Sequence, residues 1–181
     1  MRRSEEVLLL GSYLPRYVDP LRAWAERLRA VGCRVAERYP DRWYAEDALT
    51  ALAEPRELVV YFGHGVPGAW KGFGHLDAAD LSAIDPRRSH GIVASLCCYS
   101  FTPDERGLDT GPALTDAGIT ECAVGYDGRI RHEENRRLLD QLFETYQNAI
   151  GSGADPTAAV AQTMSRESPV QTVGAPGRTP S

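Results

Sequence analysis

Two short segments of the sequence carry side chains that together offer a nucleophile and a base. The apolar run LVVYF leads to Gly63-His64-Gly65, and the apolar run GIVASL leads to Cys97 and Cys98. A free thiol is mostly protonated at neutral pH, and a neighbouring imidazole raises the fraction of the nucleophilic thiolate. Histidine titrates near neutrality, so it can accept that proton and return it to a leaving amine. The two segments therefore indicate acyl-transfer chemistry at a cysteine.

Each half of this pair also has a more ordinary interpretation. A single histidine at a strand end is more often a hydrogen-bonded structural group, and buried cysteines usually behave as small hydrophobic residues. The interpretation as a reactive pair depends on both segments reaching one place in the fold. The glycines around His64 favour it, because they let the backbone turn sharply and approach a substrate. The amides of Gly65 and of the nucleophile would then line an oxyanion hole.

Apolar, β-branched runs alternate with segments of helical periodicity, which predicts a parallel sheet covered by helices on both faces. We expect the first helix to be capped by Asp19, to begin at Pro20 and to end at Gly32. The predicted strands are Val7–Leu10, Cys33–Val35, Leu58–Phe62, Ile92–Leu96 and Cys122–Tyr126. The further predicted helices run from about Tyr44 to Pro55, and over Asp77–Ser82, Pro112–Ala117, Glu133–Ile150 and Asp155–Ser165.

The predicted fold class is α/β, a three-layer α-β-α sandwich with a mostly parallel sheet. The strand order 2-1-3-4-5, as in flavodoxin, is the simplest that right-handed crossovers allow. It makes the third and fourth strands neighbours, about 4.8 Å apart. Because sites in such sheets lie beyond the carboxyl ends of strands, His64, Cys97 and Cys98 should meet at one edge. Successive strand residues point to opposite faces, so only one thiol should face the imidazole.

The length and composition indicate an ordinary globular protein. The chain has 181 residues, of which 43% are hydrophobic and 25% charged, and this size suits one domain rather than two. We expect a single domain over residues 1–167. The remaining residues, 168–181, are rich in Pro, Gly, Ser and Thr and are predicted to be a disordered tail.

The charge balance and the cysteine count exclude several classes of function. The net charge is −5 and the sequence pI is about 5.4, which disfavours nucleic acid and anionic membranes as partners. No apolar run approaches the roughly 18 residues of a membrane span, so a soluble, cytoplasmic protein is expected. Four cysteines without a CxxC spacing are too few for a disulfide framework and do not indicate zinc. We expect no metal and no cofactor.

The residues quoted above resemble the catalytic signature of clan CD cysteine peptidases, which include caspases, gingipains, clostripain and the caspase-like CHAT domains. In that clan one apolar strand leads to His-Gly, and a second leads to a small residue followed by the nucleophilic cysteine. YFGHG and ASLCC follow this pattern. Trp70 after the histidine, and the Cys-Cys pair, are similar to gingipains. The stretch from Gly111 to Met164 is similar to the carboxyl half of CHAT domains.

The resemblance implies a caspase-like or gingipain-like cysteine endopeptidase that hydrolyses peptide bonds through a Cys-His dyad and an acyl-enzyme. Cys98 is the favoured nucleophile, because Cys97 serves as the small residue before it, whereas Leu96 before Cys97 is bulky. Cys97 is the alternative nucleophile. His64 would be the general base and then the acid, and the amides of Gly65 and Cys98 would bind the oxyanion.

Residues that bind the substrate are harder to identify. The loop after the fifth predicted strand, which includes Tyr126 and Asp127, should reach the site, and Asp127 is a candidate pocket residue. An Asp-Gly pair is also typical of a simple turn. Trp70 is a candidate pocket wall, although a tryptophan in such a place often covers the edge of the core.

The expected partners are a peptide or protein substrate and a regulatory or adaptor protein that orders the loops. Two other functions stay open: a catalytically inactive caspase-like scaffold, and another thiol amidohydrolase such as a glutamine amidotransferase. The latter enzymes hold their cysteine in a glycine-flanked elbow, which SLCCYS lacks. No third group that orients His64 is identifiable, since Asp19, Asp41 and Glu46 are better explained as helix caps.

Overall fold

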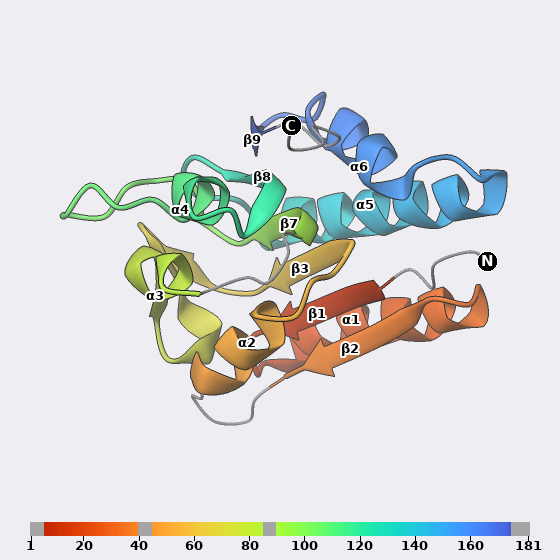
Figure 1. Ribbon diagram of the computed structural model, residues 1–181, viewed down its shortest axis with the longest axis horizontal. Helices are drawn as coiled ribbons and strands as arrows, with labels where there is room; N and C mark the ends of the chain where they lie inside the picture. Colours follow the sequence, from red (N-terminus) through yellow and green to blue (C-terminus); the bar gives the residue numbers. More distant parts are fainter. Residues whose placement is uncertain (1–5, 40–44, 85–89, 175–181) are drawn as a thin grey trace.

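The computed structural model describes residues 6–39, 45–84 and 90–174. Its centre is a six-stranded sheet in the order β2-β1-β3-β7-β8-β9 (Figure 1). All neighbours in this order are parallel except β9, which is antiparallel to β8. The predicted order 2-1-3-4-5 is confirmed, since β7 and β8 are the fourth and fifth of the expected strands. Their bounds are β1 Glu6–Gly11, β2 Arg34–Arg38, β3 Leu58–Phe62, β7 His90–Leu96, β8 Thr120–Tyr126 and β9 Val170–Gly174.

Helices cover both faces of this sheet and complete the three predicted layers (Figure 1). Helices α1, α5 and α6 pack on one face, and α2, α3 and α4 pack on the other. Their bounds are α1 Pro15–Ala30, α2 Ala45–Leu52, α3 Ala78–Ser82, α4 Thr110–Asp116, α5 His132–Ser152 and α6 Pro156–Met164.

Alternation of side chains along the strands divides the hydrophobic core in two. In β1, Val7 and Leu9 belong to the cluster that contains α1 and α5, whereas Leu8 and Leu10 belong to the cluster that contains α2. Every residue of β3 is buried, as expected for the central strand of a parallel sheet that is covered on both faces. Side chains of β3 and β7 thus pack into both core clusters, one on each face of the sheet. This packing holds the two strands whose carboxyl ends carry the candidate site.

The first helix begins one turn earlier than the sequence predicted. It starts at Pro15, whereas we expected Asp19 as its cap and Pro20 as its first residue. Proline suits the first helical turn because its missing N–H needs no partner there. Pro20 instead lies inside α1 and is buried, at the cost of one backbone hydrogen bond. The additional turn brings Arg16 and Tyr17 to the edge where β3 ends.

The segment after His64 forms a second, smaller sheet that the sequence did not predict. Its strands pair in the antiparallel order β4-β5-β6. Strands of two residues carry no readable alternation, which is why this sheet was missed. Its elements are β4 Gly65–Val66, β5 Ala69–Trp70, the 3₁₀ turn Lys71–Phe73 and β6 Leu76–Asp77.

The expected disordered tail is wrong for its first part. Residues Val170–Gly174 form β9, which pairs along its length with β8, from Val170 opposite Tyr126 to Gly174 opposite Cys122. The sequence QTVG contains β-branched residues that favour a strand. The prediction of disorder relied on the Pro and Gly content of the whole segment 168–181 and overlooked them. Residues 175–181 of the predicted tail lie outside the described residues.

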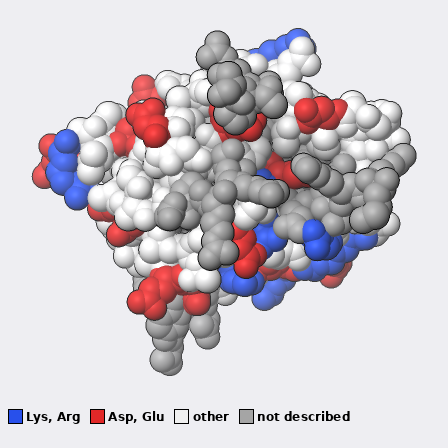
Figure 2. All heavy atoms as spheres, viewed as in Figure 1, with Lys and Arg blue, Asp and Glu red and all other residues white. Residues whose placement is uncertain are grey.

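The described residues carry surface charge of both signs (Figure 2). Acidic and basic side chains both occur in small separate groups on the face shown in Figure 2. Within residues 6–39, 45–84 and 90–174, no helix has the length and apolarity needed to cross a membrane. In the same part of the chain, no three His, Cys, Asp or Glu side chains gather as a metal ion would require.

Candidate active site

A cavity of about 610 Å³ lies at the carboxyl edge of the sheet and contains both His64 and Cys98 in its lining. His64 follows β3 after one glycine, and Cys98 lies two residues beyond the end of β7, the strand paired with β3. The rest of the lining comes from the glycine that precedes His64, from the first turn of α1, and from the segment that leads into the start of α5. These residues are Arg16, Tyr17, Gly63, Arg129, Ile130, Arg131, His132, Glu133 and Asn135.

The backbone of His64 is fixed on both sides by hydroxyl groups. Its N–H donates to Ser12 Oγ at 3.1 Å, and its carbonyl oxygen accepts from Tyr61 Oη at 2.7 Å. Tyr61 is itself held by a donation from the Gly72 amide at 2.8 Å and by a stacked Trp70 ring at 4.7 Å. Ser12 and Tyr61 are therefore positioning residues for the imidazole.

The ring of His64 is contacted by the two residues in the additional turn of α1. An Arg16 NH2 group donates to Nε2 at 2.9 Å, and Tyr17 Oη lies 3.4 Å from Nδ1. A guanidinium can only donate, so Nε2 is the acceptor and a neutral ring carries its proton on Nδ1, directed at Tyr17. Tyr17 is the orienting group that the sequence could not identify, and it was missed because the helix was predicted to begin after it.

The surroundings of His64 favour its neutral form. Partial burial lowers the pKa of His64 below its ordinary value, and the positive charges of Arg16 and Lys71 and the nearby His132 lower it further. A histidine with a lowered pKa is unprotonated at neutral pH. It is then available to accept a proton.

The two neighbouring cysteines occupy opposite sides of the sheet. Cys97 is fully buried in the cluster that contains α2 to α4, and burial raises the pKa of its thiol well above the ordinary value. Cys98 is partly exposed, borders the cluster of α1 and α5, and lines the cavity. Its Sγ lies 3.5 Å from the carbonyl oxygen of Ile130. Only Cys98 is accessible from the cavity.

The Gly65 segment approaches the two cysteines so closely that a side chain would not fit. A Cβ atom on Gly65 would overlap the carbonyl oxygen of Cys98 and would lie 2.6 Å from Cys97 Sγ. Lys71 donates its amide to the His64 carbonyl at 2.9 Å, next to the Gly65–Trp70 pair. In an antiparallel ladder the hydrogen-bonded pairs alternate, so the Gly65 amide points away from Trp70. Gly65 itself is partly buried and is not among the residues that line the cavity.

The segment after Cys98 is anchored to the end of β8. Tyr99 adopts a left-handed conformation with φ 58°, which is uncommon for a residue other than glycine. Its amide donates to Gly128 O at 2.6 Å, and the amide of Phe101 donates to Tyr126 O at 2.9 Å. Strained backbone of this kind persists where the surrounding structure holds it in place.

Three residues suggested as substrate contacts lie away from the cavity lining. Trp70 is fully buried, stacks on Tyr61 and donates to Ser95 Oγ at 3.0 Å, so it is a core residue in this structure. Tyr126 is also buried, and its hydroxyl donates to Asn135 Oδ1 at 2.9 Å. Asp127 is exposed, is absent from the cavity lining and accepts a hydrogen bond from Thr102 Oγ1 at 3.2 Å.

Two further residues of the cavity were not singled out from the sequence. Asn135 is buried and donates to the carbonyl oxygen of Leu96 at 2.9 Å, which ties the end of β7 to the first turn of α5. His132 packs edge-on against Tyr17 at 5.4 Å, and its Nδ1 is buried without a hydrogen-bond partner among the described residues. Neither residue follows a predicted strand, and so neither had a sequence signal.

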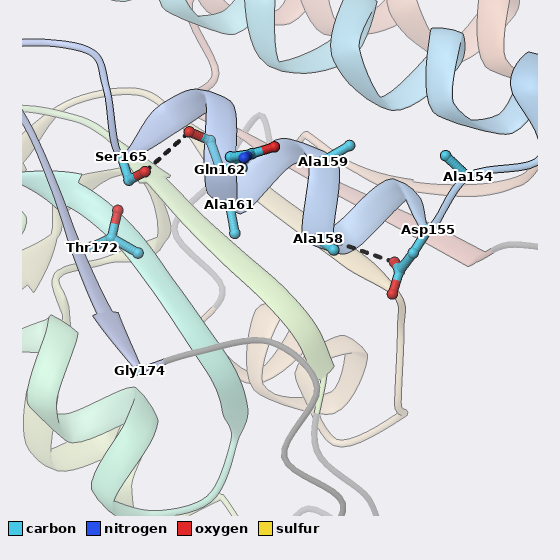
Figure 3. A pocket seen from close by; sticks show the side chains of 9 residues that line it. All are labelled: Ala154, Asp155, Ala158, Ala159, Ala161, Gln162, Ser165, Thr172 and Gly174. Carbon is cyan, nitrogen blue, oxygen red and sulfur yellow. Dashed lines mark hydrogen bonds between the residues drawn. The ribbon is translucent and has the colours of Figure 1, made fainter.

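A second hollow, of about 660 Å³, lies between α6 and β9 (Figure 3). Among the described residues, its lining contains neither cysteine nor histidine, and Asp155 is its one charged residue. Asp155 is occupied as the N-cap of α6, where it accepts from the amides of Thr157 and Ala158. The hollow therefore lacks the nucleophile and base that distinguish the cavity around His64.

The chain resembles known proteins in its three-dimensional structure, but no match was found by comparison of its sequence. No protein-family model matches the chain, and no curated protein matches it. The structure is similar to gingipain R, an Arg-specific cysteine proteinase, with a TM-score of 0.68 at 14% identity, over 90% of this chain and 43% of that one. It is similar to the Saccharomyces cerevisiae separase–securin complex with a TM-score of 0.59 at 11% identity, over 96% of this chain and 12% of that one.

A second gingipain structure, the complex of the pro- and mature domains of RgpB from Porphyromonas gingivalis, matches with a TM-score of 0.62 at 14% identity. It covers 78% of this chain and 37% of that one. Gingipain and separase are both clan CD cysteine peptidases, and the chain shares their caspase-like α/β fold. The chain spans less than half the length of the gingipain chains that it matches.

Proposed function

We propose that this chain is a cysteine endopeptidase with a caspase-like fold, in which Cys98 attacks a peptide carbonyl and His64 transfers the protons. The observation that supports this most is that a partly exposed thiol and an imidazole line the same cavity, at the ends of two paired strands. Partial burial lowers the pKa of this imidazole, which favours its role as a base. The likeness to gingipain and separase supports the fold on which such a dyad is built.

The choice of Cys98 over Cys97 rests on access and on the raised pKa of the Cys97 thiol. Cys97 is 0% exposed and its raised pKa keeps it protonated, which disfavours it as a nucleophile. Cys98 borders the same cavity as the imidazole. Successive residues at the end of β7 point to opposite faces of the sheet. The Cys97 side chain therefore packs in the core, and Cys98 borders the cavity.

In the proposed reaction, His64 takes the proton of the Cys98 thiol, and the sulfur forms a bond to the carbonyl carbon of the substrate. The amides of Gly65 and Cys98 stabilise the negative charge on the carbonyl oxygen. Collapse of this intermediate breaks the C–N bond, and His64 gives its proton to the leaving amine. A water molecule then loses a proton to His64, attacks the thioester and releases Cys98.

A catalytically inactive scaffold is the second candidate, and one observation favours it. The Nε2 atom of His64 already accepts a hydrogen bond from Arg16, so the base is engaged in the conformation described. A related amidohydrolase, such as a glutamine amidotransferase, has no such support. Complexes of the structural neighbours with a pro-domain or with securin support the proposal that a protein partner regulates the site.

Covalent labelling separates the peptidase from the scaffold. Brief treatment with iodoacetamide at neutral pH, followed by peptide mass spectrometry, should label Cys98 roughly tenfold faster than Cys33, Cys97 or Cys122. Substitution His64→Ala should abolish this difference, and should lower the hydrolysis of a fluorogenic peptide library by roughly 10²- to 10⁴-fold.

The matched control is His75→Ala, because His75 is exposed and lies outside the cavity lining. It should leave both labelling and hydrolysis unchanged. Cys97→Ala should retain activity and Cys98→Ala should lose it. Slow and equal labelling of all four thiols in the wild-type protein would instead establish the scaffold.

A further inference from the structure

Asn135 is a polar side chain buried in an otherwise apolar part of the core. It lies in the first turn of α5 with 3% of its surface exposed, and it lines the cavity that contains Cys98. The buried residues that follow it on α5, Leu138 and Leu139, belong to the cluster of α1 and α5. Burial of an amide group is unfavourable unless the group forms hydrogen bonds. The hydrogen bonds of Asn135 therefore indicate what this side chain contributes.

The amide of Asn135 connects the ends of two strands. Its Nδ2 group donates to the carbonyl oxygen of Leu96, the last residue of β7, at 2.9 Å. Its Oδ1 atom accepts from the hydroxyl of Tyr126, the last residue of β8, also at 2.9 Å. A carbonyl oxygen can only accept, so the Nδ2 side of the amide must face Leu96. Tyr126 is buried, and its hydroxyl holds the other side of the amide in place.

The carbonyl group of Leu96 belongs to the peptide unit that leads to the two cysteines. Its oxygen accepts from Asn135 and also from the amide of Gly63, at 3.4 Å. At the other side of the same peptide unit, the amide of Cys97 donates to the carbonyl oxygen of Ser95 at 2.9 Å. A bond between residues two apart closes a three-residue turn, which is common at strand ends. Both polar groups of this peptide unit are thus held.

The orientation of this peptide unit determines where the two thiols point. A peptide unit is planar, so its rotation turns the side chains that follow it in the chain. In the orientation observed, Cys97 packs in the core and Cys98 borders the cavity. The bond from Gly63 ties the same carbonyl to the segment that carries His64. One carbonyl group therefore links the segment of the candidate base to that of the candidate nucleophile.

We infer that Asn135 is a positioning residue for the proposed nucleophile. Its amide holds the peptide unit after Leu96 in the orientation that directs the Cys98 thiol into the cavity. This inference rests on the proposed function, whose nucleophile it concerns. A leucine would suit the apolar surroundings of Asn135, but it would leave the Leu96 carbonyl without its side-chain donor. A satisfied polar group in such a place favours one arrangement of the chain over others.

The substitution Asn135→Leu removes the donor and keeps a side chain that branches at the same carbon atom. The ratio of the rates at which iodoacetamide labels Cys98 and Cys97, from peptide mass spectrometry, reports which thiol faces the cavity and does not depend on catalysis. We expect this ratio to fall roughly tenfold. For a fluorogenic peptide, kcat should fall by roughly 10- to 100-fold, while KM should stay within about twofold.

The substitution Tyr126→Phe tests the same contact with a smaller change. It removes the hydroxyl that donates to Asn135 and leaves the donor to Leu96 in place. The labelling ratio and kcat should therefore fall by a smaller factor, roughly threefold. This variant decides the outcome if Asn135→Leu does not fold.

The matched control is Thr120→Val, at the amino end of β8. Thr120 is also 3% exposed, and its hydroxyl donates to the carbonyl oxygen of Cys122 at 2.9 Å. Its loss should lower the midpoint of urea unfolding, as the loss of the Asn135 amide should. The control should nevertheless keep the labelling ratio and the kcat of the wild-type protein.

The two proposals can fail separately. A wild-type labelling ratio and kcat in the folded Asn135 or Tyr126 variant would overturn the inference and leave the peptidase standing. A raised KM at unchanged kcat would also overturn it, and so would an equal loss of the ratio in Thr120→Val. A protein that hydrolyses no peptide, but labels Cys98 faster than Cys97 only while Asn135 is present, would overturn the peptidase and keep the positioning role. Equal labelling of the two thiols in the wild-type protein would overturn both.

Discussion

The contacts that hold the backbone of His64 differ from the contacts made by its imidazole ring. Ser12 and Tyr61 fix its backbone, whereas Tyr17 and Arg16 contact its ring. The first pair determines where the imidazole stands, and the second determines which nitrogen carries the proton. Because Arg16 brings a positive charge to 2.9 Å from Nε2, it acts on the basicity of the ring as well as on its orientation.

The substitution Arg16→Gln is therefore expected to raise the pKa of His64 toward its ordinary value. Burial would still hold the pKa below that value, since it is the largest cause of the lowering, and the electrostatic effects of Lys71 and His132 also remain. A titration of the His64 Cε1–H signal by NMR between pH 4 and pH 9 measures the change.

The control for this titration is Arg27→Gln on the same helix. Arg27 lies over the ring of Trp24, and its substitution should leave the His64 titration unchanged. An unchanged pKa in Arg16→Gln would show that the ion–imidazole contact does not persist in solution.

At the scale of elements, the site depends on how closely a hairpin and a strand end approach each other. The β4 segment lies against the turn after β7, with Gly65 in contact with both Cys97 and Cys98. A glycine at this point lets the segment that carries His64 lie directly beside the nucleophile. The second small sheet β4-β5-β6 then fixes this segment from outside, through Trp70 and Tyr61.

The substitution Gly65→Ala should damage both stability and reactivity. Its Cβ would overlap the carbonyl oxygen of Cys98, so the backbone of one segment has to move, at a cost of about 1–3 kcal/mol in the free energy of unfolding. The rate at which iodoacetamide labels Cys98 should change with it. Denaturant unfolding and timed labelling measure the two effects.

Gly151→Ala provides the comparison, because a Cβ at Gly151, in the last turn of α5, would meet nothing within 4 Å. This variant should unfold at the same or a slightly higher denaturant concentration. If Gly65→Ala were as stable and as reactive as Gly151→Ala, the close packing of the hairpin on the nucleophile segment would be refuted.

At the scale of the whole molecule, the end of the sheet opposite the site depends on a buried neutral histidine. His90, the first residue of β7, is fully buried; its Nδ1 accepts from the amide of Arg56 and its Nε2 donates to the carbonyl oxygen of Leu52, each at 2.9 Å. Burial, together with the charge of Arg56, lowers its pKa to about 4. Protonation of Nδ1 would also break the bond from Arg56.

This histidine should make the fold sensitive to mild acid. In the unfolded chain a histidine titrates near 6.5, so between about pH 6.5 and pH 4 the unfolded state binds a proton that the native state does not. The free energy of unfolding should therefore fall as the pH drops through this window, by on the order of 3 kcal/mol for a shift of this size. Urea unfolding at pH 7.5, 6 and 5 measures the loss.

The variant His90→Gln keeps a donor and an acceptor without a titrating group, and should lose most of this slope. His75→Asn removes an exposed histidine and should retain it. Equal slopes in the two variants would assign the acid sensitivity to other groups.

The sequence by itself determined the five parallel strands, their order and the two segments that carry the candidate dyad. Apolar β-branched runs between capped helices leave few topologies, and the parallel order places His64 and the two thiols at one edge. The alternation of strand residues between faces indicated that only one of the two thiols faces the imidazole, and the resemblance to clan CD peptidases favoured Cys98. These features follow from patterns of neighbouring residues, which can be recognised in the sequence without information on tertiary packing.

Tertiary structure alone decided the rest of the site. Arg16 and Tyr17 reach His64 because α1 begins at Pro15. Arg131 and His132, which follow the loop expected at the site, line the same cavity. Trp70 and Tyr126 turned inward and Asp127 outward. Such contacts join residues that are far apart in the chain, and no periodicity records them. Their physical cause is packing around the sheet edge, which exists only in the folded molecule.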